Sequence, residues 1–158
     1  MDPKNSEAHN NLGIIYANRE QWTEAVTEFK SALANPEYAR AYSAHVNLAE
    51  AYLRQGDLNS SLEEYRMALN AKPDSDVAHA GLGRLFQLKG QTDLAIEEWE
   101  KSLKINDRQG PLHYALAVAY LNKGEKGKAE GAFKKVIELD PQSSLAAEAK
   151  KQLESLKL

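Results

Sequence analysis

The feature that most constrains the fold of this chain is a short pattern that returns four times. A leucine followed by a small residue recurs at spacings of 36, 34 and 34 residues, at Leu12-Gly13, Leu48-Ala49, Leu82-Gly83 and Leu116-Ala117. Four residues after each leucine stands an aromatic: Tyr16, Tyr52, Phe86 and Tyr120. Each unit continues with a small residue and a second aromatic four residues later: Ala25 and Phe29, Ser61 and Tyr65, Ala95 and Trp99, Ala129 and Phe133. One such unit cannot bury its apolar face alone, so we expect the four units to stack.

Within each unit, the residue types predict two helices joined by a tight turn. Leu12 and Tyr16 are four residues apart and therefore share one helix face. Glycine follows the first helix of three units, where its left-handed backbone costs little: Gly56, Gly90 and Gly124. Glu20 holds that place in the first unit, whose turn we expect to be the least typical. Proline stops the second helix of three units at Pro36, Pro73 and Pro141, and Asp107 stands in the corresponding place of the third.

These positions resemble the tetratricopeptide repeat (TPR), whose period is 34 residues. The resemblance covers residues 6–141 and implies an all-α fold, a right-handed superhelical α-solenoid of antiparallel helix pairs. It divides the chain into the tail of a preceding repeat (1–5), four repeats (6–37, 38–75, 76–109 and 110–143) and a C-terminal capping helix (144–158). We expect helices at about 6–19, 22–34, 38–55, 58–71, 76–89, 92–105, 111–123, 126–139 and 143–156.

The joint between the first two repeats is elongated. Pro36 precedes Leu48 by three more residues than Pro73 precedes Leu82, so we expect a longer third helix or a wider loop before it. The stretch over 35–52, with its Asn-Pro-x-Tyr-Ala and Asn-Leu-x-x-Ala-Tyr elements, also resembles TPR lipoproteins that assist assembly of the type IV pilus secretin. That resemblance implies an upstream lipid anchor.

The two ends of the array differ. Pro3 precedes Leu12 by the same offset as Pro73 precedes Leu82, which suggests further repeats upstream and an uncovered outer face on the first repeat. A homo-oligomer formed through that face is a further expectation. Lys150-Lys151 replace the Leu-Gly pair in the last helix and give it the polar outer face of a cap.

Composition and motifs give no grounds for an enzyme or a cofactor. The net charge of −3 lacks the clustered basic face that nucleic acid requires, and the chain has no cysteine. No apolar run is long enough to insert into a membrane. Four histidines share one repeat position, but stacked repeats are too far apart for them to share a metal, so we interpret them as packing residues: His9, His45, His79 and His113. The paired glutamates Glu63-Glu64 and Glu97-Glu98 are most simply a solvated face.

The resemblance implies that the first helices line a concave groove that holds a peptide or partner protein. The first repeat contributes Glu7, Asn10, Asn11, Ile14 and Asn18, and the second Val46, Asn47, Glu50, Leu53 and Arg54. The third contributes Ala80, Gly81, Arg84, Gln87 and Leu88, and the fourth Tyr114, Ala115, Val118, Leu121 and Asn122. We expect Asn11 and Asn47 to hold the peptide backbone, because an amide both donates and accepts hydrogen bonds.

The functional alternatives remain open. A non-enzymatic interaction scaffold is the first, an accessory lipoprotein segment for pilus assembly the second, and the TPR region of a larger enzyme such as a glycosyltransferase the third. The compartment is likewise open between the cytoplasm and the periplasm or outer membrane, and the latter requires an upstream lipoprotein signal.

Overall fold

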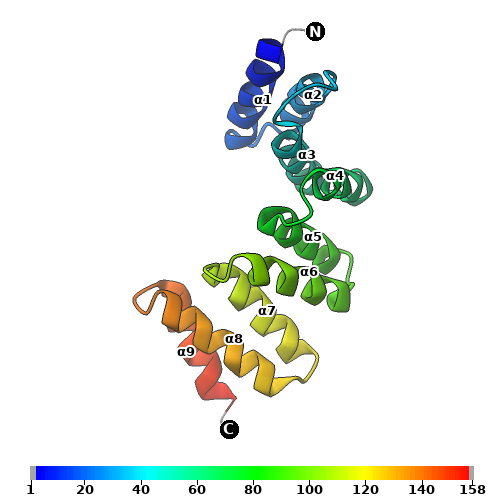
Figure 1. Cartoon of the computed structure of the whole chain (residues 1–158). Coiled ribbons are helices and arrows are strands. Elements are labelled where there is room, and N and C mark those ends of the chain that lie inside the picture. Colours follow the sequence, from blue (N-terminus) through cyan, green and yellow to red (C-terminus); the bar gives the residue numbers. More distant parts are fainter. Residues whose placement is uncertain (1–2, 157–158) are drawn as a thin grey trace.

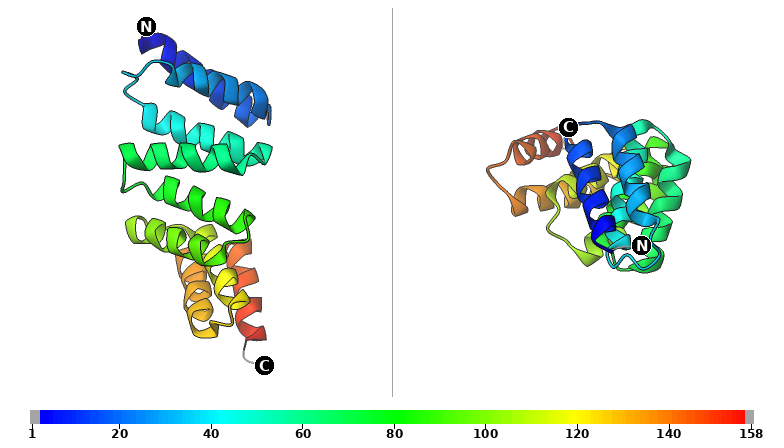
Figure 2. Two further views of the ribbon diagram at one scale, coloured as in Figure 1. Left: turned by 90° about the vertical axis from the view of Figure 1, so that its right-hand side faces the viewer. Right: turned by 90° about the horizontal axis from the view of Figure 1, so that it is seen from above.

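The computed structural model describes residues 3–156, which form nine helices and no strand (Figure 1). The first helix of each repeat is α1 (Pro3–Asn18), α3 (Ala41–Gln55), α5 (Asp76–Leu88) or α7 (Gly110–Asn122). The second is α2 (Trp22–Leu33), α4 (Leu58–Ala71), α6 (Thr92–Ile105) or α8 (Lys126–Leu139), and α9 (Ser144–Ser155) ends the array. The pairs stack along one axis as a right-handed superhelical α-solenoid, as predicted (Figure 2).

Each aromatic of a second helix fills the space between that helix and its neighbours. Phe29, Tyr65, Trp99 and Phe133 are almost completely buried, and each belongs to an apolar cluster that joins two repeats or, at the end, a repeat and α9. Small residues on the first helices make room for them. A Cβ atom added at Gly13 would lie 2.6 Å from the Phe29 ring, and one added at Gly83 would lie 2.2 Å from the Trp99 ring. The small residue after each leucine is therefore a packing requirement.

The turns inside the repeats follow the predicted chemistry. Gly56, Gly90 and Gly124 have positive φ angles of 81°, 71° and 76°. Glu20 takes the same left-handed region with φ 58°, the only residue other than glycine to do so among those described. The first turn is thus the least typical, as expected, and it carries the steric cost of a Cβ in that region.

In three repeats, a histidine of the first helix forms a hydrogen bond with a glutamate of the second helix. His9, His45 and His79 each place Nδ1 2.6–2.7 Å from a carboxylate oxygen of Glu28, Glu64 or Glu98, nineteen residues further along. The prediction of a solvated face for both glutamate pairs is therefore wrong for Glu64 and Glu98, which are largely covered by these contacts, whereas their neighbours are exposed. The fourth repeat has alanine at the corresponding place, and its histidine contacts Asp107 instead.

The elongated joint is a wider loop, and α3 begins at Ala41, three residues later than predicted. The extra residues fold inward around Tyr38, whose ring is buried against Ala32 and Ala44. The Tyr38 hydroxyl donates a hydrogen bond to Glu7 at 2.9 Å, and Arg40 contacts the same carboxylate at 2.7 Å. Burial and the Glu7 carboxylate raise the Tyr38 pKa to about 12, so the phenol remains a donor. The loop therefore fastens the second repeat to α1.

The last helix closes the array with the predicted polarity. Ala146 and Ala149 are buried against α8, whereas Lys150 and Lys151 are exposed. At the other end, α1 begins at Pro3, three residues earlier than predicted, and Asp2 lies outside the described residues. Within residues 3–156, no helix is long and apolar enough to cross a membrane.

Candidate functional site

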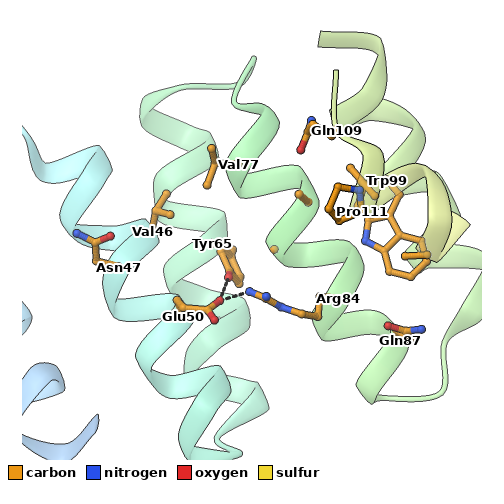
Figure 3. A pocket seen from close by; sticks show the side chains of 14 residues that line it. Val46, Asn47, Glu50, Tyr65, Val77, Arg84, Gln87, Trp99, Gln109 and Pro111 are labelled. Atoms are coloured by element: carbon orange, nitrogen blue, oxygen red, sulfur yellow. Dashed lines mark hydrogen bonds and ion pairs between the residues drawn. The ribbon is translucent and has the colours of Figure 1, made fainter. Parts of the chain in front are cut away.

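A cavity of about 750 Å³ lies between the first helices of the second, third and fourth repeats (Figure 3). Helices α3, α5 and α7 supply its walls, and two aromatics from the second helices form its floor. The lining residues are Val46, Asn47, Glu50, Tyr65, Val77, Ala80, Gly81, Arg84, Gln87, Trp99, Gln109, Pro111, Leu112 and Ala115. The volume is in the range of sites that hold a few side chains of a ligand.

A charged cluster lies at one side of this cavity. The Glu50 carboxylate accepts hydrogen bonds from Arg84 and from the Tyr65 hydroxyl, the latter at 3.2 Å (Figure 3). It also accepts one from Arg54 Nε at 2.8 Å. Burial, reinforced by the negative charge of Glu50, raises the Tyr65 pKa above its ordinary value. Tyr65 therefore stays protonated and donates to Glu50, and the Arg84 guanidinium remains half-exposed toward the cavity.

Apolar side chains line other parts of the cavity. Val46 of α3, Val77 of α5 and Pro111 of α7 are among them (Figure 3). Leu112 of α7 also lines the cavity. Val77 is among the most exposed large apolar residues of the described chain. Asn47, Gln87 and Gln109 add amide groups around the rim. The arrangement combines an apolar recess with donors and acceptors, which suits a peptide side chain and its backbone.

Tyr65 reaches the cavity because residue 81 is glycine. A Cβ atom at Gly81 would lie 2.3 Å from Tyr65 Cζ, so no larger residue fits without displacing the ring. The repeat pattern indicated only a packing role for Tyr65 and Trp99 and gave no sign of their place in the cavity floor. The pattern also gave no sign of Gln109, the N-cap of α7, or of Pro111 and Leu112 in the first turn of that helix. The signal that could have found Tyr65 is the glycine at a position where the first two repeats have asparagine.

The cavity brings together only part of the predicted groove. Its lining contains eight residues of the predicted set: Val46, Asn47, Glu50, Ala80, Gly81, Arg84, Gln87 and Ala115. Twelve predicted residues lie outside the lining: Glu7, Asn10, Asn11, Ile14, Asn18, Leu53, Arg54, Leu88, Tyr114, Val118, Leu121 and Asn122. Leu53 is a correction, because it is buried in the core between the second and third repeats and faces no groove.

The amide-rich end of the predicted groove is partly paired. Asn10 is buried and accepts a hydrogen bond of 3.4 Å from Asn47 Nδ2. Asn11, Ile14 and Asn18 are exposed on α1. The long Asn10–Asn47 bond leaves the Asn47 amide with further hydrogen-bonding capacity.

The apolar end of the predicted groove packs partly against α9, the capping helix. Tyr114, Val118 and Leu121 are half-buried and pack against the core of the fourth repeat and α9. The Tyr114 ring meets Phe133 edge to face with centroids 5.4 Å apart. Burial raises the Tyr114 pKa, with a contribution from the Glu148 carboxylate of α9.

Several solved structures share this architecture. A tetratricopeptide repeat protein from Parabacteroides merdae has a TM-score of 0.84 at 21% identity over 98% of this chain, which spans 60% of that protein. PilW, described as a widely conserved type IV pilus biogenesis factor, has a TM-score of 0.84 at 23% identity over 93% of this chain and 68% of its own. YrrB, described as a TPR protein with an unusual peptide-binding site, has 0.74 at 22% identity over 92% and 74%. At these identities the likeness establishes the fold alone.

Sequence profiles identify the family. No curated protein matches the chain. Two profiles of the tetratricopeptide repeat match, one over residues 10–76 and the other over residues 110–143. They cover the first and last parts of an array whose helix pairs all share one pattern, and the chain belongs to the tetratricopeptide-repeat family.

Proposed function

We propose that the chain is a non-enzymatic scaffold that binds an extended segment of another protein in its concave groove. The observation that carries the proposal is the cavity between α3, α5 and α7, with apolar walls and an amide rim. The fold supports it, since TPR arrays serve generally in protein–protein interaction. YrrB, whose description names a peptide-binding site, is a further support.

The cavity defines what the bound segment must carry. An apolar side chain would enter between Val77 and Leu112, where water is displaced from aliphatic surface. The peptide backbone beside it would exchange hydrogen bonds with Asn47 and, further along α1, with the exposed Asn11. Arg84, half-exposed beside Glu50, would favour an acidic neighbour.

The remaining predicted groove residues belong to the same proposal. Beyond the cavity, the peptide would continue over Leu88 and toward the half-buried Val118, Leu121 and Tyr114. Replacing both Asn11 and Asn47 by alanine should weaken binding by about 1–3 kcal/mol, because two backbone groups of the peptide would lose their partners.

The proposal can be tested by filling the cavity with a larger side chain and measuring peptide affinity. Peptides selected from a random library against the immobilised chain are labelled, and their affinities are measured by fluorescence anisotropy for the wild type and two variants. Ala80→Phe places a ring in the cavity, whereas Ala147→Phe adds the same ring to the exposed face of α9. We expect Ala80→Phe to lower affinity at least tenfold and Ala147→Phe to leave it unchanged. Equal affinities for the two variants would show that peptides bind elsewhere and refute the proposal.

A role in type IV pilus secretin assembly is the second candidate, and one observation favours it. The elongated joint seats Tyr38 in the core and links it to Glu7, so the sequence element behind the pilus resemblance is a built part of this fold. The similarity of the whole chain to PilW agrees with that element. Deleting the gene in its host should abolish surface pili and leave pilin synthesis intact, and normal piliation in the deletion strain would exclude this role.

A further inference from the structure

The floor of the cavity carries a buried hydrogen-bond donor that the fold leaves unused. Trp99 is 2% exposed and lines the cavity, and its ring nitrogen lies on the cavity side of the indole (Figure 3). No hydrogen bond joins the Trp99 Nε1–H to another residue of the described chain. Asn35 Nδ2 is the only completely covered side-chain nitrogen or oxygen of that part of the chain without a partner, so the Trp99 nitrogen keeps access to the cavity. Because this nitrogen can only donate, a ligand that displaces water from the floor must supply an acceptor.

The same part of the cavity carries an acceptor whose orientation is fixed by its neighbours. Gln109 Nε2 donates to the Asn106 backbone oxygen at 2.9 Å and to Ser102 Oγ at 3.0 Å. The Ser102 hydroxyl gives its own proton to the Asp76 backbone oxygen at 2.8 Å, so toward Gln109 it can only accept. The amide nitrogen is thus engaged, and Gln109 Oε1 is the end of the side chain turned toward the cavity (Figure 3). Trp99 and Ser102 are three residues apart on α6 and share one helix face, which places the Gln109 amide on the Trp99 side of the cavity.

We propose that the protein segment bound in the groove places the side chain of a glutamine in this part of the cavity. Trp99 Nε1–H donates to the amide oxygen of that glutamine, and Gln109 Oε1 accepts from its amide nitrogen. Its methylene groups lie against the aliphatic side chain of Leu112. This inference rests on the proposed function and specifies a residue that the bound segment must carry.

Charge and hydrogen bonding favour a carboxamide over other side chains of similar size. The charged residues of the lining are Glu50 and Arg84, and they contact each other. A carboxylate beside Gln109 Oε1 would lose its hydration and face a second acceptor, while the one cation of the lining is already paired. A methionine would fill the same space but leave the Trp99 donor and the Gln109 acceptor without partners.

Trp99 and Gln109 also depart from the pattern of the other repeats. The corresponding aromatics have no ring N–H: Phe29, Tyr65 and Phe133. Ser75 and Ser143 cap α5 and α9 by accepting from backbone N–H groups, whereas Gln109 at the start of α7 makes no such bond and turns its side chain to Ser102. Both departures fall in one part of one cavity, where together they supply a donor and an acceptor.

The probes are the labelled peptides selected from the random library whose affinity Ala80→Phe lowers. We expect these cavity-dependent peptides to share a glutamine. Replacing it by methionine, which keeps the length of the side chain and removes both amide groups, should lower affinity by about tenfold or more in fluorescence anisotropy. Replacing it by glutamate should also lower affinity. In the Trp99→Phe variant, the advantage of the glutamine peptide over the methionine peptide should fall to about threefold or less, because the ring no longer offers a donor.

The wild-type chain supplies a second measurement that needs no change at Trp99. The chain contains two tryptophans, Trp22 and Trp99, and therefore gives two indole N–H signals in a ¹H–¹⁵N spectrum, which Trp22→Phe assigns. The glutamine peptide should move the Trp99 signal downfield, as a newly formed hydrogen bond does, and the methionine peptide at saturation should not. Trp22 lies outside the cavity lining, so Trp22→Phe is also the matched control for Trp99→Phe and should preserve the preference for glutamine.

The outcomes separate this inference from the proposed function. Three results would overturn the inference and leave the scaffold proposal standing: cavity-dependent peptides without a common glutamine, equal affinities of the glutamine and methionine peptides for the wild type, or a Trp99 signal that the glutamine peptide does not move. Peptides whose affinity is insensitive to Ala80→Phe would overturn both. A preference for glutamine that Trp99→Phe reduces and Trp22→Phe preserves supports the inference.

Discussion

Gly81→Ala is the substitution that links the packing of the array to its cavity. The added methyl group would lie 2.3 Å from Tyr65 Cζ, whereas carbon atoms in contact prefer about 3.5–4.0 Å, so the ring must move by more than about 1 Å. The ring is buried and its hydroxyl is held by Glu50, which leaves little freedom to move. Overpacking of this kind costs about 1–3 kcal/mol. Alanine in a helix interior recovers about 1 kcal/mol relative to glycine.

Gly131→Ala is the control that separates the clash with the Tyr65 ring from the gain in helix propensity. Gly131 lies within α8, and a Cβ atom there meets nothing within 4 Å. This variant keeps the gain in helix propensity without the clash, so the two variants should differ in stability by about 1–3 kcal/mol. At this chain length the difference corresponds to about 3–10 °C in Tm.

Circular dichroism melts of the wild type and both variants supply the measurement, and Tyr65→Leu supplies the internal check. With the ring removed, Gly81→Ala should raise Tm as Gly131→Ala does, since the methyl group then has room. A Tm for Gly81→Ala equal to or above that of Gly131→Ala in the wild-type background would refute the assignment of Gly81 to ring packing.

Three further substitutions test other features. Glu20→Gly should raise Tm, because it removes a left-handed Cβ worth about 1 kcal/mol; an unchanged or lower Tm contradicts this. His79→Gln should lower the free energy of unfolding by about 1–2 kcal/mol in urea titrations, because Glu98 loses a partner at 2.6 Å. His9→Gln should lower the free energy of unfolding by less, because the His9 side chain is more exposed than that of His79. Hydrogen bonds from the Ser60 hydroxyl and backbone N–H lower the pKa of Asp57 in the folded chain. The contribution of Asp57 to the free energy of unfolding is therefore complete above its ordinary pKa of 3.8 and is lost as the pH falls through the lower folded value. Asp57→Asn should make stability less dependent on pH in this acid range, and an unchanged pH dependence would contradict this.

The repeat pattern predicted the helices to within three residues at every end. The two largest differences lie where the pattern is interrupted. One is the start of α1, which lies at residue 3 and not at the predicted residue 6. The other is the joint, where residues 38–40 form a loop and not the predicted start of α3. There the Tyr38 side chain is buried against Ala44, and this burial of apolar surface stabilises the loop. Local propensity decides helix positions only where tertiary packing agrees with it.

The candidate site was less accessible from sequence, since it depends on contacts between repeats. The groove positions of α3 and α5, among them Asn47, Glu50 and Arg84, were predicted from the resemblance to the tetratricopeptide repeat. The cavity floor depends on a ring that crosses from α4 toward α5, and the covered Glu64 and Glu98 depend on histidines nineteen residues away. Such contacts join positions on different helices, which the spacing within one helix does not report.

The two ends of the array differ in surface chemistry: the α9 end is charged, whereas the α1 end is apolar. At α9, Lys150 and Lys151 stand where the other repeats have their Leu-Gly or Leu-Ala pair, and packing a further helix there would remove two ammonium groups from water. At α1, Leu12 and Ile15 offer aliphatic surface to the same approach. A helix added at α1 gains apolar burial, whereas one added at α9 must first desolvate charge.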